Sequence, residues 1–159
     1  MPSDSAKSHH VEKMSVNDLA PVTAILNEAI KAGETTQALQ SQTIEQCRNW
    51  LLADKAEYET YVCKEKESVI GWAALTRFHE QEAYSPTAEP SVYVTQHARG
   101  QGVGRQLAEK GLARARKLNF HSVMLLLFPE PRYIVEWAKK LGFTEQGRDR
   151  KSTRLNSSH

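Results

Sequence analysis

Hydrophobic residues recur at helical spacing in several stretches of this chain, with polar residues between them. One such stretch covers residues 18–32, where Asn17 or Asp18 can cap a helix and Gly33 can end it. Its apolar face consists of Leu19, Val22, Ile25, Leu26, Ala29 and Ile30. The same spacing predicts helices at residues 43–54, 102–118 and 132–141. Each of these helices is therefore expected to bury one face against a common core.

Shorter stretches rich in β-branched, aromatic and other apolar residues lie between the helices. They predict strands at residues 11–14, 60–64, 69–78, 91–95, 122–128 and 144–146. The charged turn KEKES separates the second strand from the third, which suits a hairpin. Residues 123–128 are all apolar, as in a strand covered on both faces. The order β-α-α-β-β-β-α-β-α-β indicates an α/β fold with helices on both faces of a mixed sheet.

A single domain is expected, because 159 residues suffice for one core and neither a repeat nor a linker divides the chain. We expect a disordered tail at residues 1–9 and the domain at residues 10–148. Residues 149–159, DRKSTRLNSSH, resemble the translation of a sequencing-adapter oligonucleotide. They are expected to be either non-native or a short, polar, disordered end. Strands that would follow residue 146 are then expected to be truncated.

Composition narrows the class of protein. Apolar residues make up 40% and charged residues 25%, as in ordinary soluble domains. No stretch approaches the roughly 18 apolar residues that a membrane helix requires, and the start lacks the apolar core of a secretory signal. Cys47 and Cys63 have no metal-binding spacing around them, so we expect reduced thiols and no metal site. These features favour a cytoplasmic protein without a membrane partner.

The net charge of +2 does not indicate a nucleic-acid partner. Residues 149–159 contain Arg150, Lys151 and Arg154 against the single acid Asp149. Without this tail the numbers of basic and acidic residues are equal, so no basic face remains for a phosphate backbone.

A glycine-rich turn joins the strand at residues 91–95 to the following helix, and it is the best candidate for a binding site. The turn consists of Arg99, Gly100, Gln101, Gly102, Val103 and Gly104. Glycines permit backbone conformations that other residues avoid, and successive N–H groups at a helix N-terminus can bind an anion such as pyrophosphate. Arg99 and Arg105 can add positive charge. A Walker loop would require a GK pair followed by Ser or Thr, and a dinucleotide fold would place its loop after the first strand.

The segment SVYVTQHARGQGVGRQL is similar to the acetyl-coenzyme A signature of the Gcn5-related N-acetyltransferase (GNAT) family. Arg99, Gly102 and Gly104 occupy the signature positions, and AKKLGF at residues 138–143 resembles the closing helix of the family. The segments ILNEAI, RNWLL, VIGWAALTRF and AYSPTAEPSVYV further resemble phosphinothricin and methionine-sulfoximine acetyltransferases. The resemblance covers residues 11–146. It implies the GNAT fold, with a mixed, mostly antiparallel central sheet and helices on both faces.

The resemblance implies that acetyl-CoA lies between the fourth and fifth strands as cosubstrate. Its pyrophosphate would contact the loop from Arg99 to Arg105. Its pantetheine and thioester carbonyl would contact backbone groups of Val92, Tyr93 and Val94. Donors aimed at that carbonyl would stabilise the tetrahedral intermediate.

The resemblance also implies roles for side chains near the fourth strand. Glu89 matches an acidic residue that the subgroup places just before this strand, and it would act as general base through water. Tyr93 is expected to line the cleft and is the second candidate catalytic residue. Substrate contacts are expected from Glu89, Arg77 and Tyr84. Ala138 occupies the position of the usual Tyr or His general acid, so the thiolate would take its proton from elsewhere.

The function expected from these features is transfer of an acetyl group to a primary amine of a small molecule, such as an amino acid or its analogue. A homodimer is a possible assembly, since the subgroup usually forms dimers. Two alternatives remain open at this point. One is a coenzyme A-binding module with little catalysis, and the other is an acetyltransferase that acts on a protein N-terminus or lysine.

Overall fold

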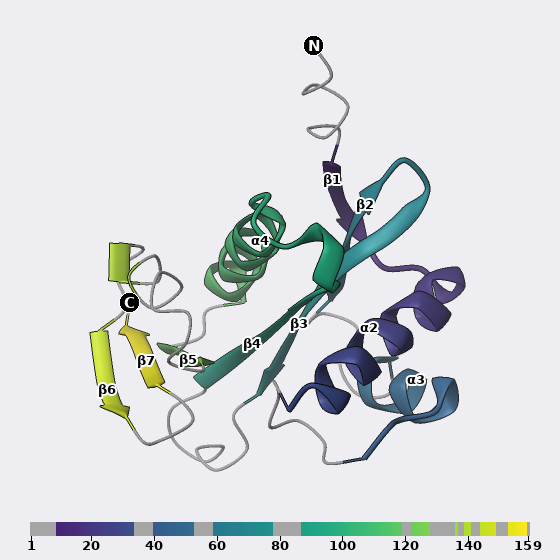
Figure 1. Cartoon of the computed structure of the whole chain (residues 1–159). Helices are drawn as coiled ribbons and strands as arrows, with labels where there is room; N and C mark the ends of the chain where they lie inside the picture. The colour runs from purple at the N-terminus through teal and green to yellow at the C-terminus, as the bar shows by residue number, and fades with distance from the viewer. Residues whose placement is uncertain are drawn as a thin grey trace.

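The fold is described from a computed structural model of the chain (Figure 1). The described residues are 9–33, 40–52, 59–77, 87–118, 122–127, 136, 139–140, 144–148 and 153–158. Within these ranges, only the backbone is described for residues 76–77, 87–90, 122–127, 144–148 and 153–158.

In the described part of the chain, seven strands form one sheet in the order β1-β2-β3-β4-β5-β7-β6. Their bounds are β1 His9–Lys13, β2 Thr60–Glu65, β3 Ser68–Arg77, β4 Thr87–Val94, β5 Ser122–Leu127, β6 Thr144–Arg148 and β7 Thr153–Ser158. All neighbouring strands are antiparallel except β4 and β5, which are parallel. The mixed, mostly antiparallel sheet expected from the sequence is confirmed.

The helices for which the structure describes bounds, α2, α3 and α4, pack on the two faces of this sheet (Figure 1). On one face lie α2, Leu19–Lys31, which follows the 3-10 turn η1, Val16–Asp18, and α3, Ile44–Leu52. On the other face lies α4, Val103–Lys117, preceded by the 3-10 turn η4, Gln96–Ala98. Of the helix predicted at residues 132–141, positions 136, 139 and 140 are helical and the remainder lies outside the described residues.

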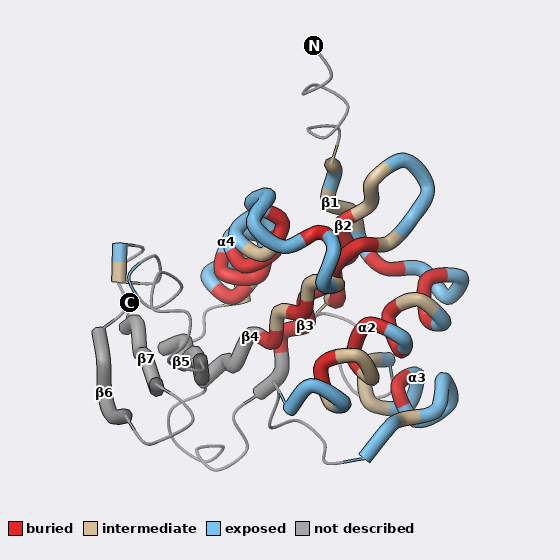
Figure 2. The backbone as a smooth tube through the Cα atoms, in the orientation of Figure 1, coloured by how far each residue is buried: buried red, intermediate tan, exposed pale blue. Residues whose placement is uncertain are grey.

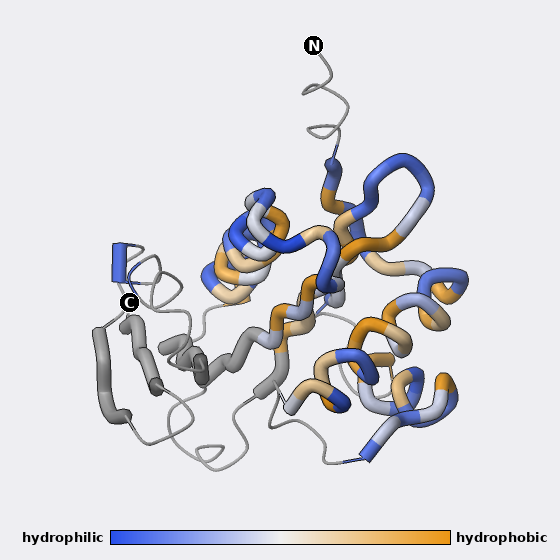
Figure 3. The backbone as a smooth tube through the Cα atoms, in the orientation of Figure 1, coloured by the Kyte–Doolittle hydropathy of each residue, from blue (hydrophilic) through white to orange (hydrophobic). Residues whose placement is uncertain are grey.

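Each face of the sheet has its own hydrophobic core. The cluster under α2 and α3 includes Leu26, Trp72 and Tyr93, and the cluster under α4 includes Val103 and Leu107. Figure 2 shows the buried residues concentrated along β2, β3 and the inner sides of α2 and α4. Figure 3 shows hydrophobic and hydrophilic residues alternating along α2 and α4, as amphipathic helices require.

Strand β4 begins at Thr87, earlier than the predicted residues 91–95, and it includes Pro90. Just after the strand, Thr95 N–H donates to Ile70 O at 3.0 Å. The backbone N–H and C=O groups of successive residues alternate in direction along an antiparallel strand. Those of Tyr93 and Ser91 therefore face β3, as those of Thr95 do, and those of the residues between them face away. Pro90, the residue before Ser91, also faces away. Its missing N–H therefore removes no bond to β3, which is why the strand continues through a proline.

The two ends of the chain also differ from expectation. His9 belongs to β1, so the first tail is shorter than residues 1–9. Residues Thr153–Ser158 form β7, which pairs with β5 on one side and β6 on the other. The expectation of disorder is wrong for these residues, because their backbone groups complete ladders on both neighbours. A non-native origin of this tail stays a prediction.

Gly71 sets how closely α4 approaches the sheet. A Cβ atom at this position of β3 would lie 3.0 Å from Tyr93 O and from Val103 Cγ1, and 3.1 Å from Leu107 Cδ1. Any side chain here would collide with the neighbouring strand and the helix above it. The glycine thus brings the first turns of α4 against β3 and β4, next to the glycine-rich turn.

Candidate cofactor site between β4 and β5

The parallel strands β4 and β5 pair over only two residues in the described structure. Thr87 is opposite Ser122, and Ala88 is opposite Val123. On its other edge β5 pairs with β7 along its whole length, whereas β4 continues to Val94 with no further strand partner on its β5 side among the described residues. Within the described residues the two strands are therefore paired at their start and not further toward their C-terminal ends, so β4 has an open edge there.

Alternation along β4 identifies the backbone groups that face this opening. The peptide groups of Val92 and Val94 point away from β3, whereas those of Tyr93 face β3, where Tyr93 is opposite Trp72. The guanidinium Nε of Arg99 donates to Val94 O at 3.2 Å from the open side. Of the three residues expected to contact pantetheine through their backbone, Val92 and Val94 have the required orientation and Tyr93 does not.

The glycine-rich turn lies at the C-terminal end of this opening. Gly100 has φ +80° and Gly102 has φ +83°, the left-handed region that favours glycine. Gly102 is the N-cap of α4, and the first bond of the helix runs from Gln106 N–H to Gly102 O at 3.1 Å. The amides of Val103, Gly104 and Arg105 precede that bond, so they are the donors a helix N-terminus offers to an anion.

Gly104 differs from the two glycines before it, because it does not use the conformational freedom that glycine permits. Gly104 is the second residue of α4 and lies outside the positive-φ region. A Cβ atom here would lie 3.6 Å from Val94 Cγ2 and 3.9 Å from Val92 Cγ1, which is ordinary contact. Because Gly104 has no side chain, the first turn of α4 leaves space next to Val92 and Val94 of β4.

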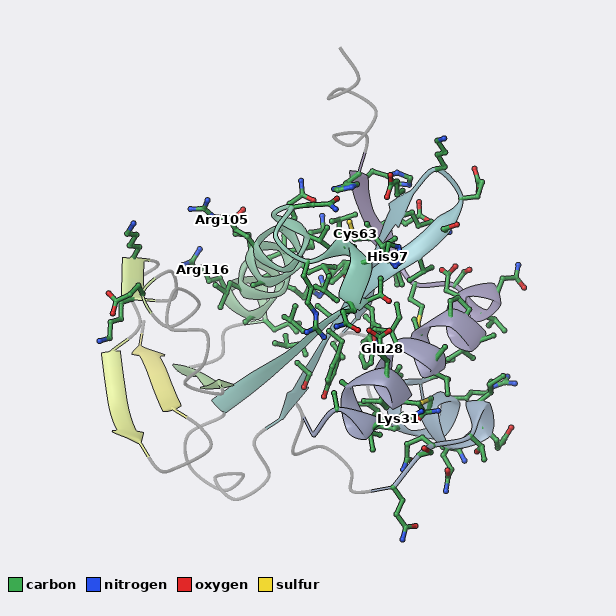
Figure 4. The ribbon with its side chains drawn as sticks, viewed as in Figure 1. Glu28, Lys31, Cys63, His97, Arg105 and Arg116 are labelled. Atoms are coloured by element: carbon green, nitrogen blue, oxygen red, sulfur yellow. The ribbon has the colours of Figure 1, made fainter. Side chains whose placement is uncertain are left out.

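The side chains of Arg99 and Arg105, which are the positive charges of the loop, have partners other than the backbone amides of the turn. Arg105 is exposed and its Nε lies 3.6 Å from Glu109 Oε2, one helical turn further on (Figure 4). The guanidinium of Arg99 is bonded to Val94 O, and Gln101 Nε2 donates to His97 O at 3.5 Å. Backbone amides and the helix dipole are therefore the principal positive groups facing the centre of the turn.

Tyr93 lies on the opposite face of the sheet from α4. Its ring is 8% exposed and packs against Trp72 with 4.8 Å between ring centroids, and Trp72 in turn meets Trp50 edge-on at 6.0 Å. This aromatic group belongs to the core beneath α2 and α3. A catalytic role for Tyr93 stays a prediction.

The remaining predicted site residues are only partly described. The backbone of Glu89 lies in β4 opposite Thr76, and that of Arg77 ends β3 opposite Ala88. Tyr84 and Ala138 lie outside the described residues. The strand register therefore brings Glu89 and Arg77 to neighbouring positions on two adjacent strands, near the end where β4 and β5 meet.

Cys63 is the thiol nearest to α4, and it is not suited to act as a nucleophile. Burial and the carboxylate of Glu65 raise the pKa of the Cys63 thiol to about 11. The Sγ atom donates to Gln106 Oε1 at 3.9 Å. A thiol with such a pKa is protonated at neutral pH, so a covalent acyl-cysteine intermediate at this residue is disfavoured.

The described residues contain no group of three or more His, Cys, Asp or Glu side chains that could hold a metal ion. Among the described helices, none is both long and apolar enough to cross a membrane.

Comparison with known proteins agrees with this arrangement. The model of the acetyltransferase (GNAT) family matches residues 23–144. The chain belongs to this family. YwnH of Bacillus subtilis (strain 168), named provisionally as a phosphinothricin acetyltransferase, is 30% identical over 131 residues, which cover 82% of this chain and 80% of YwnH. The L-methionine sulfoximine/L-methionine sulfone acetyltransferase of Pseudomonas paraeruginosa (strain DSM 24068 / PA7) is 29% identical and covers 88% and 83%.

A solved structure shows the same fold for this GNAT acetyltransferase. The phosphinothricin acetyltransferase of Sinorhizobium meliloti, in complex with acetyl-CoA, superposes with a TM-score of 0.84 at 21% identity. The match covers 95% of this chain and 88% of that chain. The enzyme class expected from the sequence, an N-acetyltransferase, is confirmed by these relatives, and acetyl-CoA is bound in the structural neighbour.

Two features near the site were not singled out from the sequence. Gly71 lies in the middle of a strand pattern, where an isolated glycine signals a close approach of backbone. Glu28 lies on α2 and contacts the turn that follows β4, 67 residues further along the chain. No local sequence pattern indicates the role of Glu28, because only the packing of α2 on the sheet brings it to its partners Thr95 and Gln96.

Proposed function

We propose that this GNAT acetyltransferase transfers the acetyl group of acetyl-CoA to the primary amine of a small molecule, an amino acid or its analogue, by direct attack in a ternary complex. The observation that carries the proposal is the one-sided pairing of β4. Among the described residues, Val92 and the N–H of Val94 have no strand partner on this edge, and they lead directly to the amides at the start of α4. The names of the relatives support an amino-acid analogue as acceptor.

In this proposal the glycine-rich turn binds the pyrophosphate of coenzyme A. Gly100 and Gly102 direct amides toward the anion, the first amides of α4 add donors, and the helix dipole favours negative charge there. The pantetheine extends along β4 like an additional strand and pairs with Val92 and Val94. Arg99 and Gln101 close the turn from outside, and Arg105 contributes longer-range charge.

The chemical step requires an oxyanion donor and a base. The amine nitrogen attacks the thioester carbonyl carbon, a C–N bond forms, and the carbonyl oxygen becomes an oxyanion. A backbone N–H of β4, at Val92 in our assignment, donates to this oxygen and contributes on the order of 3 kcal/mol. Glu89 takes the amine proton through water. The C–S bond then breaks, and the coenzyme A thiolate takes a proton from solvent.

A thiol-release screen tests the proposed reaction. The protein is incubated with acetyl-CoA and a panel of amino acids, methionine sulfoximine, phosphinothricin, simple amines and a lysine-containing peptide. We expect amine-dependent release of coenzyme A with one or more small acceptors. Binding of coenzyme A without turnover by any amine would instead identify a binding module. Turnover of the peptide alone would identify a protein acetyltransferase.

A glycine substitution tests the proposed cofactor position. Gly102→Val places a β-branched side chain at φ +83°, so we expect the loop to change conformation and coenzyme A affinity to fall at least about tenfold. Gly111→Ala is the matched control in the same helix, because no atom lies within 4 Å of its Cβ position. Equal affinity of both variants in isothermal titration calorimetry would rule out the proposed pyrophosphate site.

Replacement of Glu89 tests the proposed base. We expect Glu89→Gln to lower kcat about 100-fold with little change in coenzyme A affinity, because general-base catalysis contributes about this factor. The pH dependence of kcat should also lose its acidic limb. A wild-type pH profile and rate in this variant would exclude Glu89 as the base.

A further inference from the structure

Glu28 connects α2 to the turn that follows β4. Its Oε1 accepts a hydrogen bond from Thr95 Oγ1 at 2.8 Å, and its Oε2 accepts one from Gln96 N–H at 2.7 Å. Figure 4 shows Glu28 between α2 and the sheet. Both oxygens of one carboxylate are thus used on two consecutive residues of a segment that is distant in sequence. Short bonds to a carboxylate are among the stronger hydrogen bonds in proteins.

The segment held by Glu28 leads directly into the glycine-rich turn. Thr95 is the N-cap of η4, yet its own side chain makes no capping bond. Glu28 supplies an acceptor for the Gln96 N–H, the first N–H of the turn, which an N-cap side chain leaves without a partner because it accepts from the second or third residue. The turn is also fixed at Thr95 N–H, which donates to Ile70 O, and at Ala98, which is 1% exposed beneath α4.

We propose that Glu28 is a positioning residue for the cofactor loop: it fixes the start of η4 and thereby the direction of the amides at Gly100 and Gly102. The proposal rests on the proposed function, in which those amides bind the pyrophosphate. The physical reason is the short path between the two. Only His97, Ala98 and Arg99 separate the held Gln96 from Gly100, so a shift at one end is transmitted to the other.

The adjacent residue provides a comparison for the test. Asn27 also lies on α2 and also makes two hydrogen bonds to a distant segment. Its Oδ1 accepts from Gln42 N–H at 2.7 Å, and its Nδ2 donates to Gln42 O at 2.9 Å. These bonds fix the entry to α3, away from η4. Loss of Asn27 should therefore lower stability as loss of Glu28 does, without acting on the cofactor loop.

The test compares coenzyme A binding to the full chain by isothermal titration calorimetry, alongside thermal unfolding. We expect Glu28→Ala to raise the Kd for coenzyme A about tenfold, because small displacements of binding groups are costly. Glu28→Gln keeps an acceptor for Gln96 N–H, and its amide can donate to Thr95 Oγ1, so its Kd should stay within about twofold of wild type. Asn27→Ala should lower Tm without changing the Kd.

Two results would overturn the inference. One is a Glu28→Ala Kd within about twofold of wild type while its Tm falls as in Asn27→Ala, which would make Glu28 a purely structural contact. The other is an equal loss of affinity in Glu28→Ala and Glu28→Gln, which would assign the effect to charge. If Glu28→Ala does not fold, Thr95→Val removes only one of the two bonds and should raise the Kd about threefold; an unchanged Kd counts against the inference.

The Gly102→Val variant separates this inference from the proposed function. If Gly102→Val binds coenzyme A normally, the proposed pyrophosphate site is wrong. If Gly102→Val loses binding and Glu28→Ala does not, the site is right and only the role of Glu28 is wrong. In steady-state kinetics, Glu28→Ala should raise KM for acetyl-CoA more than KM for the amine, a difference that general destabilisation does not produce.

Discussion

The two edges of β4 differ in how far each is paired with a neighbouring strand. On one edge, every residue from Ala88 to Val94 is opposite a residue of β3, between Arg77 and Gly71. On the other edge, within the part of the chain that the structure describes, only Thr87 and Ala88 have partners on β5. The same strand therefore pairs along its length with β3 on one side, and on the other side its described residues have a strand partner only at the start.

In the proposed function, this difference lets β4 bind a ligand without losing its place in the sheet. Pairing with β3 and packing of Tyr93 and Val92 on opposite faces hold the strand in position. The open edge then offers backbone groups whose geometry is already fixed, which limits the entropy lost on binding. Pro90 fits the same division, because its lack of an N–H affects only the open edge.

The largest predicted effect comes from proline substitutions on the two edges. Ser91→Pro removes an N–H that faces β3, so we expect it to lower the free energy of unfolding by about 3 kcal/mol relative to Ser91→Ala. Val92→Pro removes an N–H that faces the opening. It should match Val92→Ala in stability within about 1 kcal/mol and should lower the rate with acetyl-CoA about 100-fold.

Chemical unfolding and thiol-release kinetics on the four variants check this prediction. Equal destabilisation by the two prolines would mean that both edges of β4 are paired in the folded protein. A normal rate in Val92→Pro would remove the Val92 amide from the proposed mechanism.

A smaller effect is predicted where the paired edge meets α4. Gly71→Ala places a Cβ atom 3.0 Å from Tyr93 O, and a backbone atom of the paired edge cannot move aside as a flexible side chain can. We expect a loss of about 2 kcal/mol in the free energy of unfolding, the usual range for overpacking. Thermal and chemical unfolding measure it.

Gly111→Ala is the control for this change, since it adds the same atom within α4 where space is open. It should raise stability by up to about 1 kcal/mol, because alanine favours helices over glycine. Wild-type stability in Gly71→Ala would show that α4 can lift from the sheet at little cost.

The smallest predicted effect concerns acid stability at the far end of the sheet. Burial raises the pKa of Asp18, but the Ser15 backbone N–H and the Lys64 ammonium outweigh burial and hold the pKa below its usual value. A depressed pKa stabilises the fold above the unfolded value of 3.8, and this stabilisation is lost as pH falls from there through the folded pKa. Asp18→Asn should cost about 1 kcal/mol near neutral pH.

Unfolding free energies between pH 6 and pH 3 check this prediction, and the difference between Asp18→Asn and wild type should shrink below pH about 4. Coenzyme A affinity near neutral pH should be the same in both proteins, because Asp18 lies in η1 and contacts Lys64 of β2, away from the open edge. If the difference in unfolding free energy between the two proteins does not depend on pH, the charge of Asp18 does not contribute to stability.

Most elements of the fold were predictable because their signals are local. The apolar spacing over residues 18–32 and 102–118 predicts α2 and α4 nearly to their observed ends, and the charged KEKES turn predicts the β2–β3 hairpin. The strand at Thr153–Ser158 was not predicted. Its polar sequence carries no strand pattern, and its order comes from backbone pairing with β5 and β6.

The sequence by itself determined the glycine-rich turn at Arg99–Gly104, its position between a strand and a helix, and through these the family. Only the tertiary structure decided that β4 has one paired and one open edge, that Gly71 brings α4 close to it, and that Glu28 fixes the turn from α2. The reason is physical. Glycines and apolar periodicity act within a few residues, whereas strand pairing and a carboxylate's hydrogen bonds depend on which distant segments the packed core brings together.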